Sequence, residues 1–192
     1  LQKKLRVIGL RPINNIVDIT NYIMMAYGQP LHCFDADMIK GRKIVVKTMP
    51  EGTPFVTLDG VEHKLSSKDL AICNVEEPMC IAGVFGGKGS GTYDSTVNVV
   101  LESAYFHPTW IRKSARRHGL STDASFRFER GIDPNGTIYA LKQAAIMAKE
   151  LAGAMVSMEI RDVYPEPMEN FKVDLEYDYA TGLIGKDVPH NM

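Results

Sequence analysis

The chain has 192 residues, of which 45% are hydrophobic and 23% are charged. This composition is typical of a soluble globular protein with one substantial core, or one core and a small appendage. The formal net charge of -1 excludes a basic coat for nucleic acid, so any RNA contact has to be local.

Cysteine usage and hydropathy narrow the class further. Cys33, Cys73 and Cys80 show no C-x-x-C spacing, so they predict neither a zinc site nor a disulfide framework, and a reducing cytoplasm fits best. No apolar run approaches the roughly 18 residues of a membrane span, and residues 1–12 lack a signal-peptide pattern. The chain begins with Leu rather than Met, so we expect a fragment.

The first predicted element is a helix over residues 14–27. It follows a cap at Asn15 and stops at Gly28 and Pro30. Its apolar face consists of Ile16, Ile19, Ile23 and Tyr27.

Short β-rich segments follow, bounded by turn residues. Asp59-Gly60 predicts a tight hairpin between two of them, and the turn at residues 76–78 pairs two others. The predicted strands are residues 43–49, 54–58, 61–65, 69–74 and 79–85.

The second half of the chain alternates a strand with helices. Residues 98–106 predict a buried strand, and Pro108 opens a helix that ends near Gly119. Asp133 and Pro134 start another helix, closed at Gly153. Its predicted inward face is Ile138, Leu141, Ala145, Ala148 and Leu151, and residues 155–164 predict a final strand.

This irregular order predicts an α+β fold, with mixed or antiparallel sheets and a few packed helices, rather than a βαβ series. The prolines and acidic residues of YPEPMEN, residues 164–170, indicate a boundary. We therefore expect one domain over residues 1–165. Residues 166–192 would be a linker and the truncated start of a next domain, beginning as a strand.

Two polar stretches carry both ordinary and functional interpretations. The glycine-rich residues 82–92 match neither the P-loop nor G-x-G-x-x-G, which leaves a plain connector or a loop beside a pocket. A basic run on the helix after Pro108 is either a solvated face or a phosphate-binding patch for RNA. It comprises Arg112, Lys113, Arg116, Arg117 and His118.

Single residues are weighed in the same way. His32 is either a hydrogen-bonded structural residue or a catalyst, whereas the adjacent Cys33 points to the opposite face of an extended chain and is a poor nucleophile candidate. Glu102 lies in a strand that is predicted to be buried, so its carboxylate must be paired or used. Arg127 and Arg130, alternating with aromatic residues on a neighbouring strand, would be its structural partners.

Four long stretches together resemble the editing module of the phenylalanyl-tRNA synthetase β subunit, in order and in spacing. The resemblance covers roughly residues 8–165, and the tail, with GLIGKDVP, resembles the start of that subunit's next domain. The stretches are RPINNIVDITNYIMMAYGQPLHCFDAD (11–37), IAGVFGG (81–87), LESAYFHP (101–108) and RRHGLSTDASFRFERGIDP (116–134).

The resemblance implies an enzyme fragment that hydrolyses tyrosine mischarged onto tRNA for phenylalanine. Its partners would be the 3′ end of that tRNA and the catalytic α subunit of an α2β2 enzyme in the cytoplasm, with no membrane. Editing would use no metal, no cofactor and no covalent intermediate, whereas the full synthetase uses ATP and Mg elsewhere.

At each of the family's site positions, this sequence carries the residue that the family's pattern has there. The resemblance implies catalytic roles for Arg11, His32 and Thr122, and substrate-binding roles for Gly86, Glu102 and Ala124. Glu102 would accept the tyrosine hydroxyl, while Gly86 and Ala124 would leave room for the ring.

Two other classes of function stay open at this point. In the first, the chain is a scaffold or RNA-docking element that has no turnover of its own. In the second, it is a module that binds a small molecule in the same pocket.

Overall fold

The computed structural model describes residues 1–187 and 189 and has an α+β fold of helices and antiparallel sheets, as predicted. The chain divides into two compact units, Leu1–Arg161 and Asp162–Met192. The second unit contains one helix, α6 (Tyr177–Ile184). The remaining elements belong to the first unit, and so does the core.

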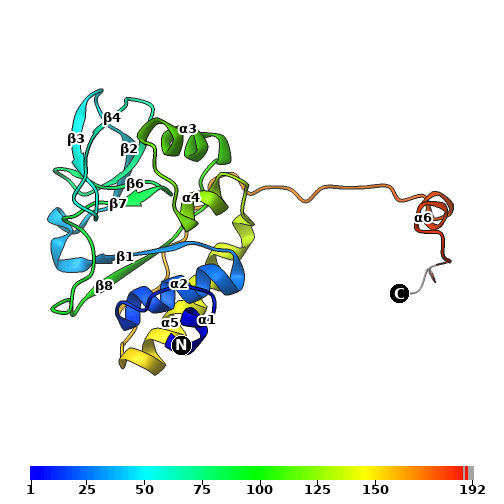
Figure 1. Ribbon diagram of the computed structural model, residues 1–192, viewed down its shortest axis with the longest axis horizontal. Coiled ribbons are helices and arrows are strands. Elements are labelled where there is room, and N and C mark those ends of the chain that lie inside the picture. The colour runs from blue at the N-terminus through cyan, green and yellow to red at the C-terminus, as the bar shows by residue number, and fades with distance from the viewer. Residues whose placement is uncertain (188, 190–192) are drawn as a thin grey trace. The chain divides into compact units, whose positions relative to one another are not determined.

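A two-stranded ladder runs through the first unit (Figure 1). β1 (Leu31–Asp35) pairs antiparallel with β8 (Val99–Ser103). Successive side chains on a strand point to opposite faces, so the ladder presents two different faces. Leu31 and Leu101 pack into one buried cluster, and Phe34 and Val100 pack into the other.

Helices cover the first of these faces. Ile19 and Ile23 meet the small side chains Ala140, Ala144 and Ala148 in a buried cluster. The helices that carry these residues lie below the ladder in Figure 1. The helices are α1 (Gln2–Val7), α2 (Asn15–Tyr27) and α5 (Thr137–Ala152).

Strands and two helices cover the other face, above the ladder in Figure 1. A four-stranded antiparallel sheet has the order β2-β5-β6-β7, and a separate hairpin joins β3 to β4. The strands are β2 (Val45–Thr48), β3 (Thr53–Val56), β4 (Glu62–Leu65), β5 (Leu70–Cys73), β6 (Pro78–Ile81) and β7 (Phe85–Gly86). The helices are α3 (Pro108–His118) and α4 (Asp123–Phe128), and short 3-10 turns are η1 (Ala36–Met38), η2 (Lys40–Arg42) and η3 (Pro134–Gly136).

The Phe/Arg alternation over residues 126–130 predicted a strand, and that prediction is wrong. These residues belong mainly to α4, which a capping box starts: Thr122 Oγ1 accepts the Ser125 N–H at 3.0 Å, and Ser125 Oγ accepts the Thr122 N–H at 2.9 Å. Two donors at the helix start are thereby satisfied, and the local capping outweighs the alternation.

Three other strand predictions fail, because the expected partner strands are missing or because the chain turns. Residues 155–164 form no strand, and Met155 and Val163 are largely exposed; within residues 1–187 no strand lies beside them to complete a ladder. The tail from residue 171 is likewise irregular until α6. The predicted strand 79–85 is two strands, because the chain reverses between Ile81 and Phe85 and pairs with itself.

Helix boundaries also differ in detail from the predictions. Asn14 rather than Asn15 caps α2, since its side chain accepts the Val17 N–H at 2.9 Å. Asp133 caps η3, one turn before α5 begins. The buried face of α5 is its alanine row rather than the larger residues, and Leu151 is half exposed.

Candidate functional site

A cavity of about 210 Å³ lies between the ladder, β7 and α4. Its wall is mostly apolar, with a few polar groups, which is the usual construction of a small-ligand site. The lining residues are Pro30, Leu31, His32, Leu58, Cys80, Gly83, Val84, Phe85, Gly86, Glu102, Phe106, Thr122, Ala124 and Phe128.

The ladder register brings the two polar candidates of the wall together. His32 on β1 is directly opposite Glu102 on β8. Opposed residues of an antiparallel pair project from the same face, so both side chains enter the cavity side by side. The sequence predicted both as site residues, but it did not predict that they are cross-strand neighbours.

Each of these side chains has a buried polar atom that lacks a hydrogen-bond partner among the described residues. The atoms are His32 Nε2 and Glu102 Oε2. The structural partners expected for Glu102 are engaged elsewhere: Arg127 bonds Asp123, and Arg130 pairs with Glu129. The ion-pair interpretation of Glu102 is therefore wrong, and its oxygen is left for a ligand or water.

Burial shifts the two groups toward their neutral forms. Burial raises the pKa of Glu102 to about 7, and it lowers the pKa of His32 to about 4. Desolvation disfavours whichever form is charged, so a carboxyl and an imidazole shift in opposite directions. Near neutral pH the imidazole is uncharged, and the carboxyl can both donate and accept a hydrogen bond.

Small residues keep the cavity open. A Cβ on Gly86 would lie 2.9 Å from Leu58 Cδ1 and 3.0 Å from His32 Cε1, so any side chain there displaces the wall. Ala124, on α4, also lines the cavity. Phe128 follows one turn later on the same face, a spacing that becomes informative only once α4 is known to be a helix.

Thr122 lines the cavity, but its hydroxyl already makes hydrogen bonds that hold the fold together. Besides capping α4, its hydroxyl donates to the Val84 carbonyl at 3.0 Å. The residue therefore fixes the start of α4 against the turn before β7. Arg11, in contrast, is exposed and is not part of the cavity wall.

The cysteines of this region are protonated thiols. Burial raises the pKa of Cys33 to about 12, and burial with the nearby Glu102 raises the pKa of Cys80 far above its ordinary value. A thiolate is the nucleophilic form of cysteine, and it is disfavoured at both positions. Among residues 1–187 and 189, no group of at least three His, Cys, Asp or Glu residues is arranged to hold a metal ion.

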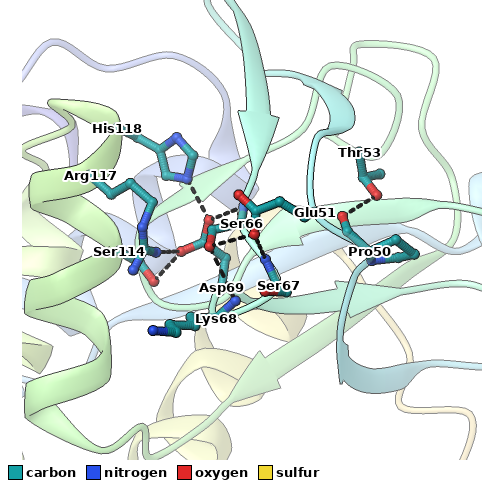
Figure 2. A network of polar contacts seen from close by, with 10 residues as sticks. All are labelled: Pro50, Glu51, Thr53, Ser66, Ser67, Lys68, Asp69, Ser114, Arg117 and His118. Carbon is teal, nitrogen blue, oxygen red and sulfur yellow. Dashed lines mark hydrogen bonds and ion pairs between the residues drawn. The ribbon is translucent and has the colours of Figure 1, made fainter.

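A second polar cluster, which the sequence analysis missed, anchors α3 (Figure 2). Asp69 is fully buried; its Oδ1 accepts from Ser114 Oγ at 2.7 Å and from Arg117, and its Oδ2 accepts from the Ser66 N–H at 2.8 Å. His118 Nε2 lies 2.7 Å from the same Oδ2. Burial alone would raise the pKa of Asp69, but the bonds from Ser114, Ser66 and His118 outweigh it and hold that pKa below its usual value.

Two members of the basic run are thus structural. Both side chains reach Asp69: His118 is almost fully buried there, whereas Arg117 pairs with the carboxylate and keeps 32% of its side chain exposed. One sequence feature could have indicated this: Ser114 and His118 are four residues apart, so they lie on the same face of the helix.

No helix within the described part of the chain is long and apolar enough to cross a membrane.

Comparison with known proteins identifies close relatives of this chain. A family model described as the B3/4 domain matches residues 1–153. A phenylalanine–tRNA ligase beta subunit of Bacteroides fragilis is 69% identical over 189 residues, which are 98% of this chain and 23% of the relative. The subunits of Porphyromonas gingivalis and Geobacter sulfurreducens are 51% and 44% identical over 193 and 191 residues, covering 100% of this chain and 23% and 24% of those relatives.

These matches confirm the resemblance that the four sequence stretches predicted. The chain spans about a quarter of the length of these relatives.

Proposed function

The chain belongs to the B3/4 domain family, and from that premise we propose that it is the editing module of a phenylalanine–tRNA ligase beta subunit. In this proposal it hydrolyses tyrosine that has been attached in error to the tRNA for phenylalanine. The single observation that carries the proposal is the pair of unpartnered polar atoms, on His32 and Glu102, in an otherwise apolar cavity.

Glu102 would supply the specificity of the site. A buried polar atom without a partner costs free energy, and a ligand hydroxyl that bonds it recovers that cost. Tyrosine carries such a hydroxyl and phenylalanine does not. A site built to bond a hydroxyl rejects the analogue that lacks it by a factor of about 10⁴ to 10⁵, a sharper selection than exclusion by size.

The reaction in this proposal is ester hydrolysis by a positioned water. The water oxygen attacks the ester carbonyl carbon, the bond to the ribose oxygen breaks, and that oxygen takes up a proton. The products are free tyrosine and tRNA with its ribose hydroxyl restored. Neutral His32 would orient the water or the ester through Nε2, since a catalytic hydrogen-bonding group is best placed before the substrate arrives.

The other residues would shape the site around these two groups. Gly86 and Ala124 leave room for the ring, and Thr122 holds α4 in position. A catalytic role for Arg11 stays a prediction. The proposed partners are the 3′ end of the tRNA and a catalytic α subunit, in whose enzyme ATP and Mg would serve synthesis rather than editing.

A deacylation assay with the variant Ala124→Trp tests the proposal. The chain, and a whole synthetase with the same substitution, are incubated with tyrosyl-tRNA. Indole bulk in the cavity should abolish hydrolysis, while Ala152→Trp at the exposed end of α5 should leave it unchanged. A chain and synthetase that bind free tyrosine but never cleave the ester would instead be small-molecule-binding proteins.

A further inference from the structure

The basic run on α3 divides into two sets with different environments. Arg117 and His118 are held by Asp69, as Figure 2 shows. The other members, Arg112, Lys113 and Arg116, are exposed, and no ion pair engages them among the described residues. Arg112 and Arg116 are four residues apart, so they lie on the same flank of the helix.

That flank borders a groove between α3 and α4 with a volume of about 260 Å³. Arg116 and the turn at residues 119–121 form one side of the groove, and Phe126 and Glu129 form the other. We call it the α3–α4 groove.

An aromatic group and a cation are stacked at the edge of this groove. The Arg130 guanidinium lies 3.5 Å from the centroid of the Phe126 ring, yet 52% of Phe126 remains exposed. The one carboxylate of the groove wall, Glu129, is paired with Arg130 at 2.6 Å. The wall therefore combines unpaired positive charge on α3 with a planar stacking surface on α4.

The short helix α4 separates this groove from the cavity of the candidate site. Ala124 and Phe128 line the cavity, whereas Phe126 and Glu129 line the groove. A ligand whose reacting end enters the cavity can therefore continue along the groove, around α4.

We propose that the α3–α4 groove binds the single-stranded RNA segment that precedes the aminoacylated nucleotide. Arg112 and Arg116 contact its phosphates, and the Phe126–Arg130 stack supports one of its bases. Phosphate neutralisation together with base stacking is the general way in which proteins hold single-stranded nucleic acid without reading its sequence. The inference rests on the proposed function, because it takes a charged tRNA as the ligand.

The first test is binding of a fluorescent single-stranded RNA, measured by anisotropy at several salt concentrations. Arg112→Gln with Arg116→Gln should make the slope of log affinity against log salt shallower by about 1.4, about 0.7 for each lost phosphate contact. Phe126→Leu should weaken binding about tenfold, through lost stacking, with the slope unchanged. The matched control is Lys142→Gln with Lys149→Gln on the exposed side of α5, which should change neither quantity.

The second test separates this inference from the proposed function by comparing two esters. Tyrosyl-adenosine lacks the preceding RNA, so the groove variants should hydrolyse it at the parental rate while losing about tenfold in kcat/KM on tyrosyl-tRNA. A parent that cleaves neither ester would refute the proposed function. RNA binding in the first test would still decide whether the groove holds RNA.

Two results would overturn the inference. One is that the groove variants affect RNA binding no more than the control pair on α5. The other is that a polyglutamate peptide of equal charge binds as tightly as the RNA, because the groove would then be a general site for acidic chains.

Discussion

Glu102 and His32 lie side by side in the cavity, but burial acts on them with opposite sign. Burial raises the pKa of the Glu102 carboxyl to about 7 and lowers the pKa of the His32 imidazole to about 4. Between pH 4.5 and 6.5, the ordinary pKa values of the two groups, both are neutral in the folded protein and both are charged in the unfolded chain. Their effects on the number of bound protons therefore cancel.

This cancellation predicts that single substitutions reveal opposite pH slopes of the free energy of unfolding. Glu102→Gln leaves His32, which binds fewer protons when folded, so stability should rise with pH between about 4 and 6.5. His32→Gln leaves Glu102, which binds more protons when folded, so stability should fall as pH rises from about 4.5 to 7. Each change should amount to roughly 3 kcal/mol at most.

Denaturant unfolding at a series of pH values measures these slopes. Glu150→Gln on the exposed side of α5 is the control and should follow the parent. If both pocket variants retain the parental pH profile, the two side chains are not desolvated as described.

A substitution at Gly86 should lower both the stability of the protein and its activity. Gly86→Ala places a Cβ against Leu58 and His32, so it should narrow the cavity and cost about 1–3 kcal/mol of stability through overpacking. Hydrolysis of tyrosyl-tRNA should fall with it. Gly89→Ala nearby has no atom within 4 Å of the new Cβ and should leave activity unchanged. Equal activity of the two variants would show that Gly86 does not border the substrate.

At the scale of elements, the Asp69 cluster fixes α3 against the start of β5. Asp69→Asn keeps the shape of the side chain but leaves Arg117 and His118 without their carboxylate. Breaking a buried charge cluster from one side costs about 3 kcal/mol, so thermal unfolding should shift to lower temperature. Glu76→Gln removes an exposed contact to Lys40 and should leave the transition in place. A shift of similar size in both variants would contradict the anchoring role.

A comparison of the predicted with the observed elements shows which of them short-range sequence signals determine. The helices α2 and α3 and the Asp59-Gly60 hairpin were predicted because caps, prolines and glycines act within a few residues. The strand predicted from the Phe/Arg alternation was wrong because the capping box at Thr122 decides the conformation of α4.

The candidate site was predictable only in part, because sequence shows its residues but not how they pair in space. The resemblance selected the residues of the cavity wall, but their pairing is a property of strand register. That His32 faces Glu102 depends on the pairing of two strands far apart in sequence, whereas Arg127 is held by a local bond to Asp123, four residues before it on α4. Asp69 was missed because its side-chain partners on α3, Ser114, Arg117 and His118, are 45, 48 and 49 residues away in sequence.

At the scale of the whole molecule, the described structure and the family match concern the same region. The first unit ends at Arg161 and the family model ends at residue 153. The predicted boundary near residue 165 and the identity of the tail as the start of a next domain stay predictions. The cavity, the α3–α4 groove and the Asp69 cluster all lie within the first unit.

The most direct test of the central claim is the ratio of kcat/KM for tyrosyl-tRNA to that for phenylalanyl-tRNA, measured for the parent and for Glu102→Ala. We predict that the parent prefers the tyrosyl ester by at least about 10², because only its hydroxyl bonds the unpartnered carboxyl, and that the variant brings the ratio close to one. A parent that cleaves both esters equally, or a variant that keeps the parental ratio, would contradict the account of this cavity as a site selective for tyrosine.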